Sequence, residues 1–276
     1  FNRCGKYILS SNDEESETLN SIYENGLICG VNDLTYDNSL KSKYPFLHYK
    51  EAIFSPSTGI FDSHSFIHSL SRDFQSLGGN ILLGNETLNV EQSSKGYEVF
   101  IQDKNTQNQF VVITNILVNS AGLNAVHIAN LVNEGNTYQE EFVKGEYYIY
   151  QGKEKLENLI YPTPSENSLG LHATIDLGKG IRFGPSAYVV NEIDYSLSSH
   201  QKSRFLEAVQ SYWPSIQAED LTPGYSGIRP KLKGIKDFII DSGIVSDNQY
   251  VNVLGYASPG LTSSLALGIE VSNLIE

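Results

Sequence analysis

The sequence contains no methionine, only two cysteines and far fewer basic than acidic residues. Translation begins with methionine, and its removal normally requires a small second residue, so the bulky Phe1 is not expected to be the encoded N-terminus. Cys4 and Cys29 are too few for a disulfide framework and lack metal-ligand spacing, which predicts reduced thiols in an intracellular protein. The 19 Lys and Arg residues against 32 Asp and Glu residues give a net charge of −13, which argues against nucleic-acid binding.

Long apolar runs are also missing. No stretch reaches the roughly 18 consecutive apolar residues that a membrane-spanning helix needs, and no basic segment followed by an apolar one opens the chain. His64 and His68 have i, i+4 spacing but no acidic third ligand nearby, so no metal site is predicted. With 276 residues, 40% of them hydrophobic, the chain can bury a core as one large domain or two interleaved ones.

Hydrophobic periodicity predicts a mixture of helices and strands, which indicates an α/β or α+β body. A helix is expected from Asp13 to Gly26, where the glycine would end it. A second helix is expected over 62–79, with Phe66, Ile67, Leu70, Phe74 and Leu77 on one face. Other helices are expected from about 124, over 200–212 with Phe205, Ala208, Val209 and Tyr212 inward, and over 261–274. Strands are expected at 5–10, 81–83 (buried), 86–91, 97–101 and 110–113 (a hairpin), 116–119, in short antiparallel pieces over 144–190, and at 237–240 and 250–255.

Nine short segments resemble, in the same order, those of FAD enzymes of the D-amino-acid-oxidase-like superfamily, and within it the L-2-hydroxyglutarate oxidase/dehydrogenase branch. The last two, about thirty residues apart, are the most specific to that branch. The segments are Cys4-Gly5-Lys6, Ser57–Asp62, Asn119–Leu123, Lys144–Tyr148, Leu159–Pro162, Gly170–Thr174, Phe183–Pro185, Gly227–Leu232 and Ser258–Ser264.

The resemblance implies an FAD-binding Rossmann-like domain interleaved with an antiparallel-sheet substrate domain. Residues 1–55 and 136–225 would form the substrate domain, and residues 56–135 and 226–276 the FAD-binding domain. The family's first βαβ unit, with its Gly-x-Gly-x-x-Gly turn, has no counterpart here. Its catalytic histidine also lies upstream of the segment that matches Cys4-Gly5-Lys6. The FAD-binding domain is therefore expected to be incomplete, with exposed sheet edges, unless an N-terminal fragment completes the fold.

Cofactor-binding residues follow from the same resemblance. The family runs FAD past the turn Ser120-Ala121-Gly122, and it points the helix after Pro259-Gly260 at the flavin ring, where Leu261, Thr262 and Ser263 form the first turn. The positive end of a helix dipole would stabilise negative charge there. Gly227 is also expected beside the cofactor. From spacing alone, each segment is equally consistent with a tight turn or close packing.

Substrate-binding residues are expected at three positions. Arg229 could hold a carboxylate with two parallel hydrogen bonds, although it could instead pair with a structural acid such as Asp237. His172 could donate to a carboxylate or shuttle a proton, or be an ordinary strand histidine. Tyr147 would place its phenol in the substrate pocket, or be an ordinary packing aromatic. Lys231 and Arg182 are two further cations that could bind a second carboxylate, or simply be solvated.

The predicted reaction is FAD-dependent oxidation of a small 2-hydroxy acid, L-2-hydroxyglutarate to 2-oxoglutarate, by hydride transfer to the flavin. Oxygen or a quinone would accept the electrons. The predicted location is cytoplasmic, or the mitochondrial matrix in a eukaryote, with peripheral contact with the inner membrane as an option. Two alternatives remain: another enzyme of the superfamily, acting on glycerol 3-phosphate or on an amino acid or amine, and a truncated, non-catalytic remnant or interaction module.

Overall fold

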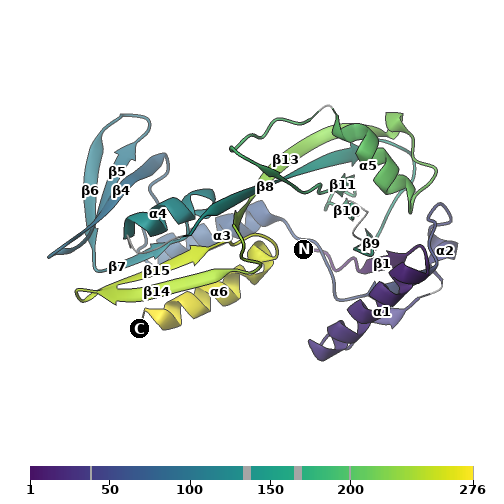
Figure 1. Ribbon diagram of the computed structural model, residues 1–276, viewed down its shortest axis with the longest axis horizontal. Helices are drawn as coiled ribbons and strands as arrows, with labels where there is room; N and C mark the ends of the chain where they lie inside the picture. The colour runs from purple at the N-terminus through teal and green to yellow at the C-terminus, as the bar shows by residue number, and fades with distance from the viewer. Residues whose placement is uncertain (38, 133–137, 165–169, 199, 276) are drawn as a thin grey trace. The chain divides into compact units, whose positions relative to one another are not determined.

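The computed structural model describes residues 1–37, 39–132, 138–164, 170–198 and 200–275, which form two compact units. Unit 1 comprises Phe1–Leu70, Lys144–Tyr188 and Tyr195–Gly227, and unit 2 comprises Ser71–Val143, Val189–Asp194 and Ile228–Glu276. Helices and strands are mixed throughout, which confirms the predicted α/β character (Figure 1). The chain crosses between the units several times, so each unit is discontinuous in sequence. Residues 56–70 belong to unit 1, and the described residues 138–143 to unit 2.

A nine-stranded sheet organises unit 1, in the order β12-β8-β11-β10-β9-β1-β3-β2, with β13 also paired to β8. Most pairs within it are antiparallel, as predicted, but β1 and β9 run parallel, with Ile8 opposite Tyr161. The strands are β1 (Lys6–Ser10), β2 (Thr35–Tyr36), β3 (Glu51–Ser55), β8 (Glu140–Tyr150), β9 (Leu159–Pro162), β10 (His172–Ile175), β11 (Ile181–Gly184), β12 (Tyr188–Val190) and β13 (Leu221–Leu232).

Alternate residues of these strands point to opposite sides of the sheet. One side is a continuous core, in which Tyr148, Phe183, Phe205, Tyr212 and Trp213 are fully buried. Helix α5 (Gln201–Gln210) contributes Phe205 and Val209 to this core, which confirms its predicted inner face. The remaining helical segments of unit 1 are α1 (Asp13–Ile28), α2 (Leu40–Lys43) and the 3-10 turn η2 (Ala218–Asp220).

Helix α1 does not end at Gly26 as predicted. It continues to Ile28, and Gly30, with φ +83°, follows as the terminating residue. The Val31 N–H then donates to the Gly26 carbonyl at 2.9 Å. A Cβ on Gly26 would lie 2.5 Å from the Leu34 side chain, so this glycine serves close packing rather than termination.

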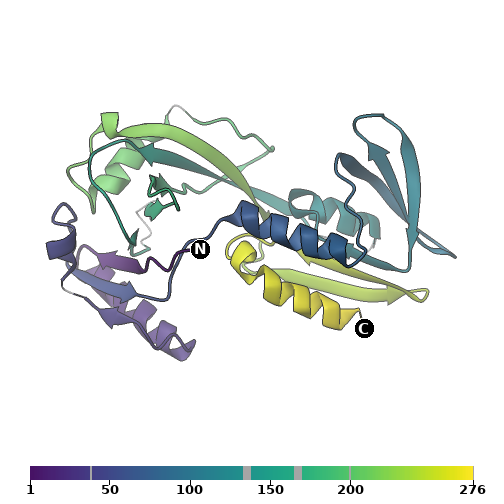
Figure 2. The same ribbon diagram turned by 180° about the vertical axis from the view of Figure 1, so that it is seen from behind.

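Unit 2 holds two three-stranded sheets. Strands β4 (Asn85–Ser93), β5 (Gly96–Asp103) and β6 (Gln109–Thr114) form an antiparallel sheet that includes the predicted hairpin. Strands β14 (Ile239–Val245), β15 (Asn248–Leu254) and β7 (Ile116–Asn119) form the other, in which β15 and β7 are parallel. After β7 come the 3-10 turn η1 (Gly122–Asn124) and α4 (Ala125–Val132), and the chain ends with α6 (Gly260–Leu274). Figures 1 and 2 show α4 on one side of the β14-β15-β7 sheet and α6 on the other.

Two apolar segments are not buried as their patterns suggested. Residues 81–83, predicted as a buried strand, lie outside every strand, and all three side chains are exposed. Helix α3 (Ser63–Ser76) forms as predicted, with Asp62 accepting hydrogen bonds from the Ser65 and His64 N–H groups. None of its residues is buried, however, and Ile67, Leu70 and Phe74 are exposed. Within the described residues, no helix is long and apolar enough to cross a membrane.

Candidate functional site

The turn between β7 and α4, where Ser120, Ala121 and Gly122 lie, is held by one buried side chain. Asn119 Nδ2 donates to the Ala125 carbonyl at 2.8 Å, and Asn119 Oδ1 accepts from the Ala121 N–H at 3.2 Å. The same amide donates to Asn252 Oδ1 on β15 at 2.9 Å. Asn252 in turn donates to Asp241 Oδ2 at 3.2 Å. Because buried amides are costly unless they are paired, this network fixes the shape of the turn.

Glycine at position 122 is required by the backbone rather than by packing. Its φ is +59°, and a Cβ built there would meet no atom within 4 Å. All three residues of the turn, Ser120 to Gly122, are exposed. The turn therefore presents open backbone, to which another molecule could come close.

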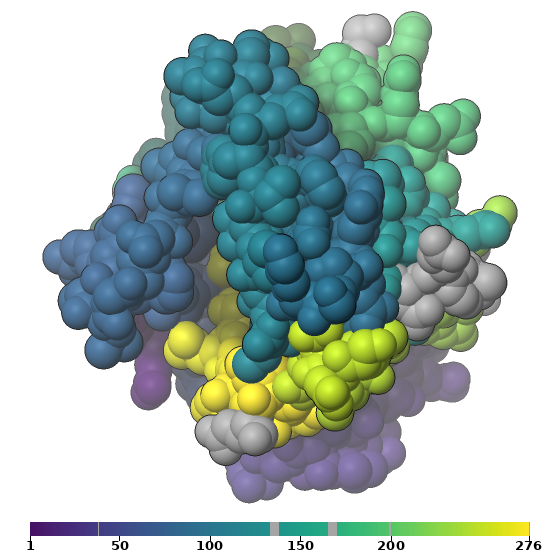
Figure 3. Space-filling view, turned by 90° about the vertical axis from the view of Figure 1, so that its left-hand side faces the viewer, coloured from purple at the N-terminus to yellow at the C-terminus, as the bar shows by residue number. Residues whose placement is uncertain are grey.

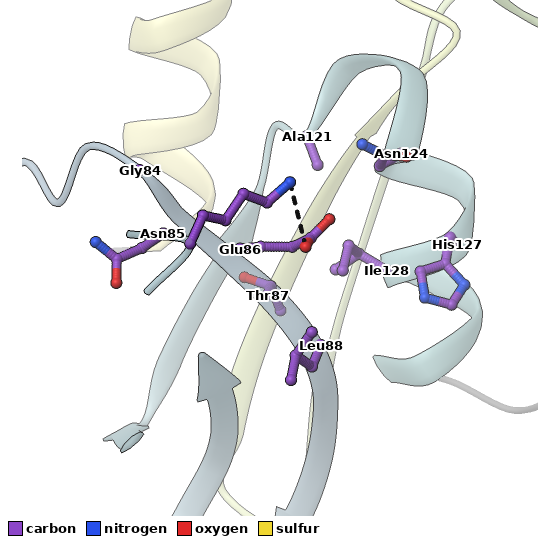
Figure 4. A pocket seen from close by; sticks show the side chains of 10 residues that line it. Gly84, Asn85, Glu86, Thr87, Leu88, Ala121, Asn124, His127 and Ile128 are labelled. Atoms are coloured by element: carbon purple, nitrogen blue, oxygen red, sulfur yellow. Dashed lines mark ion pairs between the residues drawn. The ribbon is translucent and has the colours of Figure 1, made fainter. Parts of the chain in front are cut away.

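A pocket of about 630 Å³ lies beside this turn. It falls within the roughly 300–1,000 Å³ typical of small-molecule sites. Figure 4 shows Glu86 and Thr87 on the first part of β4 and Asn124, His127 and Ile128 on the opposite wall. Lys104 Nζ forms an ion pair of 3.2 Å with Glu86 Oε2, drawn as the dashed line. The lining residues are Gly84–Leu88, Lys104, Ala121, Asn124, His127 and Ile128.

Helix α6 begins at Gly260, with Pro259 as N-cap residue and no side-chain cap hydrogen bond. The hydroxyls of Thr262 and Ser263 both reach the Pro259 carbonyl, at 2.9 and 3.2 Å. The hydroxyls are thus directed at the helix's own backbone. The Gly260 and Ser263 N–H groups also donate to backbone carbonyls, those of Ala257 and Pro259. Among the described residues, the first-turn donors left for a ligand are therefore the N–H groups of Leu261 and Thr262. A hollow of about 380 Å³, lined by residues 256–262, lies at this end of the helix.

Substrate-site predictions His172 and Tyr147 lie on the side of the unit 1 sheet that faces away from the Trp213 core. His172 is paired with Gly184 in the β10–β11 register, and a Cβ on Gly184 would lie 2.7 Å from the Tyr147 ring. Gly184 therefore makes room for the Tyr147 ring. Tyr147 also stacks on Tyr225, with ring centroids 4.6 Å apart.

Tyr161, for which the sequence indicated no role, stacks on His172. The ring centroids are 3.6 Å apart and the planes differ by 6°. Burial raises the pKa of the Tyr161 phenol, and the neighbouring Cys4 adds to that rise, so the phenol stays protonated at neutral pH. No spacing in the sequence could have paired these residues, because the contact depends on the register of β9 and β10.

The remaining predicted residues lie on β13, with Gly227 and Arg229 two positions apart. Within the described ranges, Arg229 forms no ion pair, so the alternative of a salt bridge to Asp237 is not observed. Arg182, considered as a spare cation, is paired with Asp176 at 2.6 Å. No group of three or more potential metal ligands occurs in the described part of the chain.

The structure fits FAD in two respects. The pocket beside Ser120-Ala121-Gly122 has the volume and mixed polarity of a nucleotide site, and the small Ala121 side chain in its lining leaves the backbone of the turn accessible. The uncapped start of α6 offers backbone donors and a positive helix end, which suits an electron-rich ring system.

Comparisons with known proteins agree with these features. The sequence profile of the DAO family, described as FAD dependent oxidoreductase, matches residues 1–274. The mitochondrial L-2-hydroxyglutarate dehydrogenase of Arabidopsis thaliana is 29% identical over 98% of this chain and 66% of that protein. The L-2-hydroxyglutarate dehydrogenase of Indibacter alkaliphilus is 28% identical over 97% of this chain and 76% of that protein. The chain thus spans about two thirds of the length of the first of these relatives.

Structural comparison gives the same fold. The L-α-glycerophosphate oxidase of Mycoplasma pneumoniae, solved with FAD bound, superposes with a TM-score of 0.84 at 21% identity. The alignment covers 98% of this chain and 72% of that one. The predicted resemblance to the L-2-hydroxyglutarate branch is confirmed by the two dehydrogenase relatives, and FAD is the cofactor of the matching family. The chain therefore belongs to the DAO family of FAD-dependent oxidoreductases.

Proposed function

We propose that this chain forms the greater part of an FAD-dependent oxidoreductase that oxidises a 2-hydroxy acid, with L-2-hydroxyglutarate as substrate and 2-oxoglutarate as product. The observation that carries this proposal is the pocket of about 630 Å³ beside the β7–α4 turn, since it lies at the turn expected to receive FAD. The two dehydrogenase relatives, both named for L-2-hydroxyglutarate, support the choice of substrate.

Each candidate residue has a distinct role in this proposal. Bound FAD would supply the hydride acceptor for this oxidation. A 2-hydroxy acid becomes a 2-oxo acid when it loses a hydride from carbon and a proton from the hydroxyl. The Leu261 and Thr262 N–H groups in the first turn of α6 stabilise negative charge at the helix end. Arg229 binds a substrate carboxylate through two parallel hydrogen bonds. His172 donates a hydrogen bond to the substrate, and Tyr147 lines the same side of the sheet.

Flavin retention tests the proposal directly. The purified chain is incubated with FAD, passed through gel filtration and examined by visible absorbance. The parent chain is expected to keep the flavin bands, whereas Ala121→Leu, which fills the pocket wall, is expected to weaken FAD binding at least tenfold. Ala266→Leu is the matched control, because Ala266 is an equally exposed alanine of unit 2 outside the pocket. A flavin-free parent chain would favour the alternative of a non-catalytic interaction module.

A second candidate substrate has specific support. The superposition on an L-α-glycerophosphate oxidase favours glycerol 3-phosphate as the alternative. Turnover of L-2-hydroxyglutarate, glycerol 3-phosphate and sarcosine by the flavin-loaded protein separates the three substrate classes. Faster reduction of the bound flavin by glycerol 3-phosphate than by L-2-hydroxyglutarate would overturn the substrate proposed here.

A further segment completes unit 2 in this proposal. Strand β7 is paired with β15 on one side, and no described strand pairs with its other edge. Its outward side chains Ile116 and Val118 are exposed, as are Leu261 and Leu265 of α6. A βαβ segment that adds a parallel strand beside β7 would cover both. Co-expression with the N-terminal segment of a dehydrogenase relative is expected to give a stable complex that retains more FAD than the chain alone.

A further inference from the structure

Lys6 differs from the paired lysines of the protein. Lys43, Lys50 and Lys104 form ion pairs with Glu157, Asp13 and Glu86, respectively. Within the described ranges, Lys6 forms none. Its amine instead lies 5.2 Å from the centroid of the Tyr161 ring, in a cation–π contact. Burial lowers the pKa of the Lys6 amine, so a charged partner would be favourable there.

Strand register places Lys6 on the same side of the sheet as the Tyr161–His172 stack. In the parallel β1–β9 pair, Ile8 lies opposite Tyr161, and Lys6 points to the same side as Ile8. Its antiparallel partner on β3 is Ser55, whose hydroxyl lies 2.9 Å from that of Thr58. A cation thus lies beside the Tyr161–His172 stack, on a strand whose register partner is Ser55.

The charges around this cluster indicate which anion it takes. The chain has a net charge of −13, so an uncompensated, half-buried cation is unusual for it. Arg182, another cation on this side of the sheet, is already neutralised by Asp176 at 2.6 Å. One available positive charge matches one carboxylate, whereas a phosphate ester carries nearly two negative charges and commonly needs more donors.

We infer that Lys6, beside Tyr161 and His172, forms a carboxylate subsite that holds the second carboxylate of a dicarboxylic 2-hydroxy acid. The choice of a 2-hydroxy acid rests on the proposed function, whereas the subsite rests on the geometry around Lys6. A dicarboxylate would then have its second carboxylate bound by Lys6, which makes Lys6 a specificity-determining residue that selects dicarboxylic over monocarboxylic acids.

Binding of two unreactive ligands tests the subsite. Calorimetry with the full chain in the presence of FAD compares glutarate, which has two carboxylates, with butyrate, which has one. The parent chain is expected to bind glutarate more tightly. Lys6→Met keeps the apolar stem and removes the charge, and it is expected to raise the Kd for glutarate about 10-fold to 100-fold while leaving butyrate unchanged. Lys6→Arg is expected to preserve most of the preference, because it keeps the charge.

Lys153→Met is the control, because Lys153 is an exposed lysine of unit 1 that, within the described residues, forms no ion pair and has no aromatic ring contact of the kind that Lys6 makes with Tyr161. Circular dichroism of each variant shows whether it folds. The subsite is wrong if the parent chain does not prefer glutarate, if Lys6→Met weakens both ligands equally or neither, or if glycerol 3-phosphate competes better than glutarate.

Flavin retention, measured on the same samples, separates this inference from the proposed function. A chain that holds no flavin yet loses its glutarate preference in Lys6→Met supports the subsite and contradicts the proposed redox function. A chain that holds flavin but shows no such preference contradicts the subsite alone.

Discussion

The two units bury their apolar side chains very differently. Unit 1 has one large continuous core around Trp213, built from the inner side of the nine-stranded sheet and helix α5, and one small cluster of Leu19, Leu34 and Ile53. Unit 2 has two small clusters, both on the side of α4, around Tyr250 and Leu254. The β4-β5-β6 sheet and the C-terminal hairpin and helix present their side chains on the face seen in Figure 3. The exposed apolar side chains of this unit include Phe74, Phe110, Val111, Val112, Ile113, Ile116, Val118, Leu261, Leu265 and Ile269.

This difference indicates different structural needs. A unit with a continuous core carries its own folding free energy, whereas large exposed apolar areas mark surfaces that bind another segment or partner. In unit 2, the buried polar network of Asn119 and Asn252 supplies specific structure where apolar burial is limited. The stability of unit 1 should therefore depend most on the volume of its buried side chains. The stability of unit 2 should depend more on its buried polar contacts.

The largest effect is expected for Trp213→Ala in unit 1. Trp213 is fully buried and contacts Phe46, Tyr150 and Phe183, with its ring centroid 4.4 Å from that of Phe46. Removing so large a side chain leaves a cavity and is expected to lower the free energy of unfolding by about 3–5 kcal/mol. Urea denaturation followed by circular dichroism measures the change.

Trp213→Phe is the matched control for this substitution. The Trp213 indole nitrogen has no hydrogen-bond partner among the described residues, so replacement by phenylalanine loses volume but no hydrogen bond. Its cost should be well below that of Trp213→Ala. Equal costs for the two variants would show that the site does not depend on packed volume.

A smaller effect is expected for Asn252→Ala in unit 2. The substitution removes the acceptor of Asn119 Nδ2, in a buried setting, and the donor to Asp241, in a partly buried one. The expected loss is about 1–3 kcal/mol, together with weaker FAD retention because the Ser120–Gly122 turn is loosened. Thermal unfolding and flavin absorbance provide the two measurements.

A double-mutant cycle with Asn119→Ala sharpens this prediction. Because the two amides share one hydrogen bond, the combined loss should be smaller than the sum of the single losses. Strict additivity would mean that the two residues act independently and that Asn252 does not support the turn.

The sequence predicted the elements of this fold better than their burial. The α3 periodicity correctly identified a helix, but periodicity reports only that apolar residues share a face, and no packed neighbour buries Ile67 or Phe74. The prediction of a buried strand at residues 81–83 was wrong for a related reason. A short apolar run predicts a buried strand only when a partner strand is available, and none of the described strands pairs there.

In the candidate site, too, local features could be predicted from the sequence and features that depend on distant neighbours could not. Residues next to one another in sequence, such as Ser120 to Gly122 or Pro259 to Ser263, could be identified from a local motif, because a turn and the helix after it are local structure. Tyr161, Lys6 and Asn252 received no role, since each depends on a register between distant strands. The predicted roles of Arg229, His172 and Tyr147 stay predictions until ligand binding is measured.

The smallest effect on stability is expected for Leu265→Gln on α6. It tests whether the exposed apolar side chains of unit 2 contribute to the stability of the chain. Leu265 is 58% exposed, although it is as apolar as the core residues of unit 1. Replacing it should change the free energy of unfolding of the chain by no more than about 0.5 kcal/mol, because little apolar area is lost from the interior.

The same substitution should reduce self-association, or binding of a completing segment, measured by analytical ultracentrifugation. Glu270→Gln, five residues further along the same helix and also exposed, controls for a change of surface polarity. A loss of stability as large as that of Trp213→Ala would mean that α6 is already covered within the chain, and the two units would then not differ in the way proposed.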